Sequence, residues 1–104
     1  MVEEISRKRV RTFQDLEVWR VGRAIRNRSY EIADNLPQHE RYNLASQIRR
    51  AAISVTANVA EGYGRFHFKE NIQCCRISRG SAYELIDHLI HVTILNISPT
   101  RMSS

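Results

Sequence analysis

Glycine and proline are scarce in this chain of 104 residues, and three of the six mark two breaks within it. Pro37 marks one break, and the pair Gly62 and Gly64 marks the other. The residue before a proline is pushed out of the helical region, and glycine is common where a helix ends. Four glycines and two prolines in the whole chain fit long unbroken helices better than many short strands joined by turns.

Apolar residues recur at helical spacing in three segments, 13–35, 39–61 and 67–96. The stripes comprise Val18, Val21, Ile25, Ile32 and Leu36 in the first segment; Leu44, Ile48, Ala51, Ala52, Val55 and Val59 in the second; and Phe68, Ile72, Cys75, Ala82, Tyr83, Ile86, Leu89, Ile90 and Thr93 in the third. Three helices with short connections predict a single-domain, all-α, up-down antiparallel bundle. Residues 1–12 are interpreted as a basic arm and residues 97–104 as a frayed tail.

Two of the expected helices carry a second apolar face. These faces comprise Leu16, Trp19 and Tyr30 in the first segment and Tyr42, Ile53, Ala57 and Ala60 in the second. A three-helix bundle of this size cannot bury both faces of two helices. We therefore expect a homo-oligomer whose subunit interface contains Leu16, Trp19, Tyr30, Tyr42 and Ile53.

Basic residues outnumber acidic ones, with 16 lysines and arginines against 11 aspartates and glutamates and a formal net charge of +5. This balance permits a polyanionic partner such as RNA or DNA. Folding the chain at Pro37 brings the basic arm and the GYGR loop (62–65) to one end of the bundle, where Glu61 is expected to cap the first helix or to neutralise nearby cations. We predict a nucleic-acid-binding basic pole there, consisting of Arg7, Lys8, Arg9, Arg11, Arg65 and Lys69. A solvated charged tail is the alternative.

The two glycines of the GYGR loop could belong to a phosphate-binding loop or to the end of a helix. The GYGR loop follows a helix and lacks the Lys-Ser/Thr pair of a phosphate loop, so its context argues against nucleotide binding. Gly62 is predicted to take the left-handed position past a helix end and Gly64 to let the chain reverse, with a phosphate contact by Arg65 as the alternative.

We predict that Gly80, in mid-helix, allows two helices to pack closely. Arg79 is expected to extend outward or to pair with an acid of a neighbouring subunit.

No arrangement of residues indicates catalysis or a cofactor. His88 and His91 are three residues apart beside Asp87, but a third metal ligand would have to come from His39 on another element. We therefore expect no enzyme and no metal site.

The adjacent cysteines, Cys74 and Cys75, are expected to be free thiols in a reducing compartment. The N-terminus lacks the apolar run of a signal peptide, and no apolar run approaches the ~20 residues that span a bilayer. We expect a cytoplasmic protein that does not associate with membranes.

Several motifs, in order, closely resemble one bacterial family. They are FQDLEVW (13–19) with Tyr30, LPQHERYNL (36–44), QIRRAAISVTANVAEGYGR (47–65) and ISRGSAYEL (77–85). The family is that of the four-helix-bundle proteins encoded within intervening sequences of 23S ribosomal RNA genes, and the accessory protein of diversity-generating retroelements resembles it more distantly. The sequence differs from the family pattern at RFHFKE (65–70), where a serine is usual, and after His91, where the family's fourth helix would follow.

This resemblance implies an all-α bundle that assembles into a ring-like homo-oligomer, typically a pentamer, with no known enzymatic activity and a suspected role in nucleic-acid binding. The segment after His91 predicts a truncated member with three helices. Together with the basic pole, the resemblance predicts a non-catalytic, oligomeric protein that contacts RNA or DNA phosphates. Two alternatives stay open: a protein–protein interaction scaffold without nucleic-acid binding, and a truncated member without a defined activity.

Overall fold

The computed structural model describes residues 12–40, 42–65 and 67–95, and all regular structure in these ranges is helical. The elements are two 3-10 turns, η1 (Phe13–Asp15) and η2 (Gln38–Glu40), and three helices, α2 (Glu17–Asp34), α3 (Leu44–Tyr63) and α4 (Phe68–Leu95). The prediction of an all-α chain with three helices is therefore confirmed. The predicted arm, apart from Thr12, and the predicted tail lie outside the described residues.

A capped turn separates the start of the expected first helix, 13–35, from the rest. The Thr12 hydroxyl accepts a hydrogen bond from the Gln14 amide (3.1 Å), and the Thr12 amide donates to the Asp15 carboxylate (3.3 Å). This reciprocal pair is a capping box. Leu16 then takes an extended conformation (ψ 133°), so α2 begins one residue later. The turn fixes the direction from which the chain enters α2.

The connection at Pro37 is longer than the sequence pattern indicates. Helix α2 ends at Asp34, η2 follows the proline, and α3 begins at Leu44 rather than at residue 39. Leu36 and Leu44, on either side of the connection, are both buried. The connection is therefore held against the core at its two ends.

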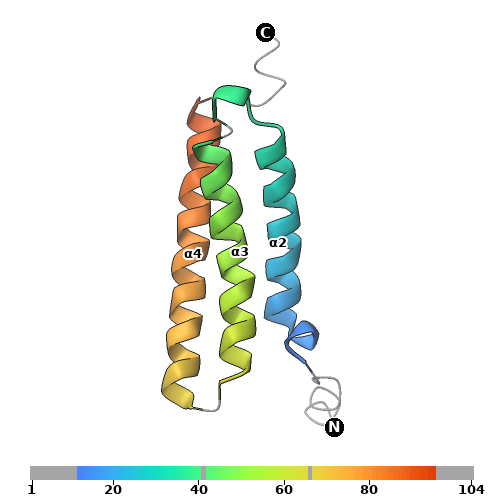
Figure 1. Cartoon of the computed structure of the whole chain (residues 1–104), viewed down its shortest axis with the longest axis vertical. Coiled ribbons are helices and arrows are strands. Elements are labelled where there is room, and N and C mark those ends of the chain that lie inside the picture. Colours follow the sequence, from blue (N-terminus) through green and yellow to red (C-terminus); the bar gives the residue numbers. More distant parts are fainter. Residues whose placement is uncertain (1–11, 41, 66, 96–104) are drawn as a thin grey trace.

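The three helices run up, down and up, with α3 between the other two (Figure 1). Helix α3 packs against both α2 and α4, whereas α2 and α4 make almost no contact with each other across the described residues. The three helices thus form an open layer, and no described residue belongs to a fourth helix.

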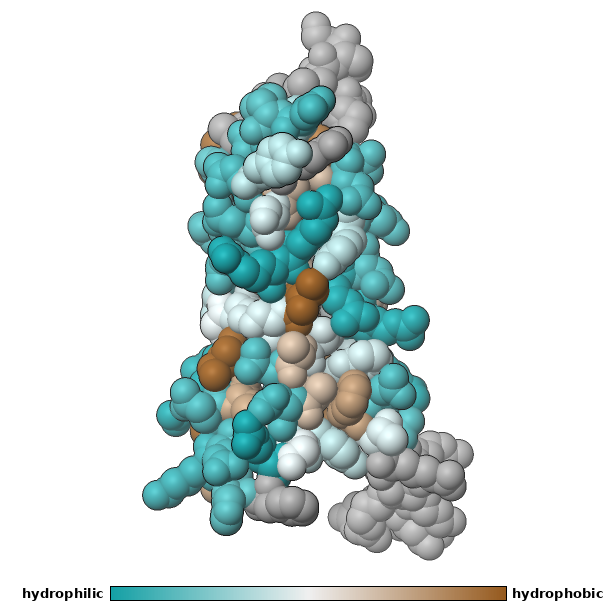
Figure 2. Space-filling view, viewed as in Figure 1, coloured by the Kyte–Doolittle hydropathy of each residue, from teal (hydrophilic) through white to brown (hydrophobic). Residues whose placement is uncertain are grey.

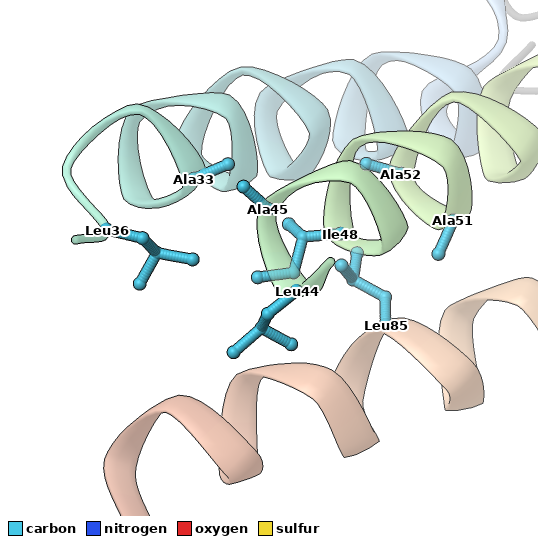
Figure 3. Close-up of a cluster of buried hydrophobic side chains, with 8 residues drawn as sticks. All are labelled: Ala33, Leu36, Leu44, Ala45, Ile48, Ala51, Ala52 and Leu85. Atoms are coloured by element: carbon cyan, nitrogen blue, oxygen red, sulfur yellow. The ribbon is translucent and has the colours of Figure 1, made fainter. Parts of the chain in front are cut away.

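The hydrophobic core lies where the three helices meet, and α3 supplies most of it (Figure 3). Its buried members are Ala33, Leu36, Leu44, Ala45, Ile48, Ala51, Ala52 and Leu85. Half of them are alanines, which let the helix backbones approach closely. The predicted stripe of the second helix is confirmed where it enters this core, and its later members Val55 and Val59 are half-buried.

The predicted stripes of the first and third helices are wrong over much of their length. On α2 the side that packs against α3 carries the small residues Gly22, Ser29 and Ala33. The large apolar residues of the predicted stripe are exposed: Val18 by 60%, Val21 by 49% and Ile25 by 46%. On α4 the buried residues are Cys74, Ser78 and Leu85, whereas the exposed ones include Phe68, Tyr83, Ile86 and Ile90. The physical reason is that closely packed helices favour small side chains, which a hydrophobicity pattern weights least.

Close helix packing occurs at Gly22 and Gly62. A Cβ added at Gly22 would lie 3.0 Å from Thr56 Cγ2, and one at Gly62 would lie 3.1 Å from Cys74 Cβ. The packing role predicted for Gly80 is wrong, because this residue is exposed and no described atom lies within 4 Å of an added Cβ. Gly62 lies inside α3 and has no left-handed backbone, so its predicted position past the helix end is also wrong.

Candidate nucleic-acid interface

Chain topology brings η1 and the α3–α4 connection to the same end of the layer, as the sequence predicted (Figure 1). In keeping with this placement, η1 packs against α3. Two residues of the predicted basic pole, Arg65 and Lys69, are described and exposed at this end. The other four lie outside the described residues: Arg7, Lys8, Arg9 and Arg11.

Acidic residues of the same chain hold Arg65. Its guanidinium is hydrogen-bonded to the Glu61 carboxylate one helical turn earlier and lies 3.7 Å from Glu70 Oε1. The hydrogen bond to Glu61 and the charge of that carboxylate raise the pKa of Arg65 above its usual value. Of the two roles expected for Glu61, neutralising a cation is the one observed. With Lys69 included, the described part of the pole holds two cations and two carboxylates and therefore carries no net charge.

The GYGR loop forms a helix end. The Gly64 amide donates to the carbonyls of Ala60 (3.3 Å) and Glu61 (3.1 Å), and the Asn71 side chain donates to the Gly62 carbonyl (2.7 Å). Gly64 caps α3 with an ordinary right-handed backbone (φ −81°, ψ −2°). Because these backbone groups bond within the chain, the geometry favours the helix-end interpretation over a phosphate-binding loop.

A second group of cations, which the sequence analysis missed, lies on α2. We call Arg20, Arg23 and Arg26 the arginine cluster; their spacing of three residues places each one beside the next on the helix surface. They line a surface hollow together with Gln14, Asp15 and Trp19. A sequence signal for the cluster exists, because residues 18–30 contain four arginines and no acidic residue.

Described residues anchor two members of the arginine cluster and leave the third, Arg23, without a partner among them. Arg20 is held on η1 by a hydrogen bond to a backbone carbonyl (3.0 Å) and by an ion pair with Asp15 (3.5 Å). Arg26 donates to the Thr56 hydroxyl (3.1 Å). Arg23 is exposed and has no hydrogen bond or ion pair with any described residue. Within the described part of the chain, the cluster therefore presents one guanidinium without an acidic partner between two positioned ones.

Trp19 contacts both η1 and one member of the arginine cluster. Its ring meets the Phe13 ring edge-on, with centroids 5.4 Å apart and planes inclined by 67°. The Arg26 guanidinium lies 5.9 Å from the Trp19 centroid, within cation–π range. The tryptophan is half-buried by these contacts within its own chain.

The other residues predicted at a subunit interface fall into two groups. Leu16 and Tyr30 are half-buried like Trp19, and the Arg49 guanidinium lies 5.8 Å from the Tyr30 centroid. Tyr42 and Ile53 are exposed, by 88% and 44%. Three of the five are thus partly packed within the chain, which reduces what a subunit contact would gain from them.

Over residues 12–40, 42–65 and 67–95, no three histidine, cysteine or acidic side chains converge on a point that would hold a metal ion. His88 lies 3.1 Å from the Glu84 carboxylate. Cys74 is buried and Cys75 is exposed, and both are free thiols. None of the described helices is long and apolar enough to cross a membrane.

The 23S rRNA-intervening sequence protein family model matches residues 14–102. No curated protein matches the sequence. The matched region contains all three helices and every cation of the arginine cluster. The chain therefore belongs to the 23S rRNA-intervening sequence protein family.

Proposed function

We propose that this protein is a non-catalytic nucleic-acid-binding protein that contacts RNA or DNA phosphates. The observation that supports the proposal is the arginine cluster, in which three guanidinium groups border one hollow and Arg23 has no acidic partner among the described residues. Guanidinium suits this role because its planar fork donates two hydrogen bonds to one phosphate.

The dimensions of the cluster suit a phosphate backbone. Residues three apart in a helix are separated by about 4.5 Å along its axis, so Arg20 to Arg26 extends over about 9 Å. Successive phosphates of one strand advance about 3.4 Å along a duplex, so the cluster spans two or three of them. Contacts to phosphates carry no base information, and binding should tolerate many sequences. Asp15 and Trp19 position the two outer arginines and so reduce the ordering cost of binding.

The basic arm directly precedes η1 in the sequence. Arg11 is the neighbour in sequence of Thr12, which caps η1, and η1 residues line the hollow. The arm residues Arg7, Lys8, Arg9 and Arg11 are therefore further phosphate contacts in this proposal. Arg65 is left out of it, because Glu61 and Glu70 already hold that guanidinium.

We also propose that the protein forms a ring-like homo-oligomer and that it is located in the cytoplasm. Assembly is supported by the large apolar side chains that α2 and α4 leave exposed. It would also matter for binding, since linked copies raise the effective concentration of the next phosphate contact. The cytoplasmic location rests on the two free thiols, which persist in reducing compartments.

The test is a fluorescence-anisotropy titration of mixed-sequence RNA and DNA at two salt concentrations. We expect Arg23→Ala to weaken binding to both and to make the slope of log K against log salt shallower by about 1, because one phosphate contact releases about one counterion. Arg76→Ala is the matched control, since Arg76 is exposed on α4 and outside the hollow. The control should bind as the unsubstituted protein does.

Two outcomes would count against this proposal in different ways. Equal binding by the Arg23→Ala and unsubstituted proteins would remove the arginine cluster from the interface. No binding by the unsubstituted protein at low salt would reject nucleic-acid binding itself. The protein–protein scaffold, which the exposed apolar side chains favour, would then be the better function.

A further inference from the structure

The hollow bordered by the arginine cluster also contains an aromatic side chain. Trp19 is half-buried and lines the hollow beside the three arginines. Phosphate groups bind to guanidinium groups and gain little from direct contact with an indole ring. The hollow therefore offers a second kind of contact, which the phosphates of a nucleic acid do not use.

Helix spacing places Trp19 beside Arg23. Residues four apart in a helix lie on the same face, with Cβ atoms about 5–6 Å apart. Stepping ~100° per residue, Trp19, Arg23 and Arg26 fall within about 60° of each other around α2. The Arg26 guanidinium lies 5.9 Å from the Trp19 centroid. The indole and two guanidinium groups thus form one stripe, just as a base and the adjacent phosphates are neighbours along a strand.

The hollow has room for a nucleobase, and contacts within the chain hold its shape. Its volume is about 800 Å³, within the ~300–1,000 Å³ of pockets that hold small molecules. The turn η1 forms one wall, which is held by its capping box and by the hydrogen bond from Arg20 to the Gln14 carbonyl (3.0 Å). The Phe13 ring meets the indole edge-on, with the centroids 5.4 Å apart. A site held in this way loses less side-chain freedom when a ligand binds.

Charge and hydropathy at the hollow favour a ligand with both an anionic and an apolar part. The lining residues include three arginines and one aspartate, which gives them a net charge of +2. Where η1 meets the start of α2, at the lower right of Figure 2, hydrophilic, pale and apolar side chains lie side by side. A nucleotide whose base is unpaired has both parts, because its phosphate is charged and its base presents a flat aromatic face.

We propose that the hollow binds single-stranded nucleic acid, with one unpaired base stacked on the exposed part of the Trp19 indole and the adjacent phosphates on the arginine cluster. This inference rests on the proposed function and adds to it the strandedness of the ligand. In a duplex the bases are stacked on each other, whereas a single strand can turn a base out into the hollow. Trp19 is half-buried between η1 and the arginines, so it does not protrude as the side chains that wedge into a duplex do.

The test compares three fluorescein-labelled DNA probes by anisotropy at two salt concentrations. They are a mixed-sequence strand of about 12 nucleotides, the same strand annealed to its complement, and the same strand with abasic sites in place of its bases. The abasic strand keeps the phosphates and loses only the stacking. At the higher salt concentration, where phosphate contacts are weakest, the single strand should bind at least about fivefold more tightly than either other probe, because a single stacked base contributes about that factor or more.

Trp19 also reports on its own contacts, because it is the single tryptophan of the chain. A base stacked on the indole quenches its fluorescence. Titration with the unlabelled single strand should therefore quench the emission of the unsubstituted protein until the site is saturated. The abasic strand should leave the emission nearly unchanged at the same degree of binding.

Variants of Trp19 separate stacking from phosphate contact. Trp19→Leu keeps an apolar side chain against η1 and removes the aromatic face. It should abolish the preference for the single strand over the abasic strand and leave the salt slope unchanged, because stacking releases no counterion. Trp19→Phe should retain part of the preference, and Arg23→Ala should weaken the binding of all three probes.

Tyr30→Leu is the matched control. Tyr30 is also a half-buried aromatic residue of α2, and the Arg49 guanidinium lies 5.8 Å from its ring centroid, but it does not line the hollow. The control should bind the three probes as the unsubstituted protein does. Loss of the preference in Tyr30→Leu and not in Trp19→Leu would place the stacked base elsewhere and overturn the inference.

The remaining outcomes distinguish this inference from the proposed function. Equal binding of the single and abasic strands, tighter binding of the duplex at the higher salt concentration, or unquenched emission with the strand bound would overturn the inference and leave phosphate binding intact. No binding of any probe at low salt would overturn both. Circular dichroism checks that Trp19→Leu stays helical, and if it does not, the quenching titration of the unsubstituted protein decides.

Discussion

Two mid-helix glycines, Gly22 and Gly80, should respond in opposite ways to the same substitution by alanine. In an exposed helix interior, glycine is less favourable than alanine by about 1 kcal/mol, because it loses more backbone freedom on folding. A Cβ at position 80 meets no described atom within 4 Å. Gly80→Ala should therefore stabilise the protein by nearly the whole of that amount.

At Gly22 the same gain is opposed by packing. The new Cβ would lie 3.0 Å from Thr56 Cγ2 and 3.6 Å from Val55 Cγ1, where favourable carbon contacts begin near ~3.5 Å. Thr56 is 2% exposed, accepts a hydrogen bond from Arg26 and donates one to a backbone carbonyl at 3.2 Å. It cannot turn away without losing both, so α2 must move outward. Overpacking of this kind costs about 1–3 kcal/mol, which leaves Gly22→Ala neutral to about 2 kcal/mol destabilising.

Thermal unfolding at one fixed protein concentration, followed by circular dichroism, separates the two sites. For a domain of this size, 1 kcal/mol shifts the melting temperature by about 4–8 °C. We expect a rise of that order for Gly80→Ala and no rise or a fall for Gly22→Ala. If Gly22→Ala raised the melting temperature as much as Gly80→Ala does, α2 and α3 could not be as close as the structure has them.

Two further predictions concern single contacts. Leu85→Ala should reduce the free energy of unfolding by about 2–5 kcal/mol in urea denaturation, because Leu85 is 2% exposed in the core. The control is Ile94→Ala, at a position 72% exposed, which should change the free energy of unfolding little. Similar losses for both variants would contradict the placement of Leu85 in the core. Asn71→Ala should reduce the free energy of unfolding by about 1 kcal/mol in the same assay, because it removes the hydrogen bond to the Gly62 carbonyl at the end of α3. Substitution of the nearby exposed Gln73 by alanine should leave the free energy of unfolding unchanged. An unchanged stability of Asn71→Ala would show that the Gly62 carbonyl has another hydrogen-bond partner.

Sequence reasoning predicted the number and order of the helices because long apolar periodicities and rare breaks leave few alternatives. It also predicted which residues of α3 enter the core, since this middle helix has neighbours on two sides and its stripe is broad. The same reasoning misplaced the packed sides of α2 and α4. Each outer helix contacts a single neighbour through small residues such as Gly22 and Ser78. Periodicity reports where apolar residues gather, and it cannot tell which neighbour covers them.

The candidate site was predicted less completely for a related reason. The turn η1 and the GYGR loop do share one end of the layer, which follows from topology alone. The pairing of Arg65 with Glu61 and Glu70 depends on side-chain positions that a count of charges does not contain. Conversely, the segment 18–30, which contains Arg20, Arg23 and Arg26, has no acidic residue. The sequence prediction placed cations only where the chain ends and the loops meet, so it missed cations spread along a helix.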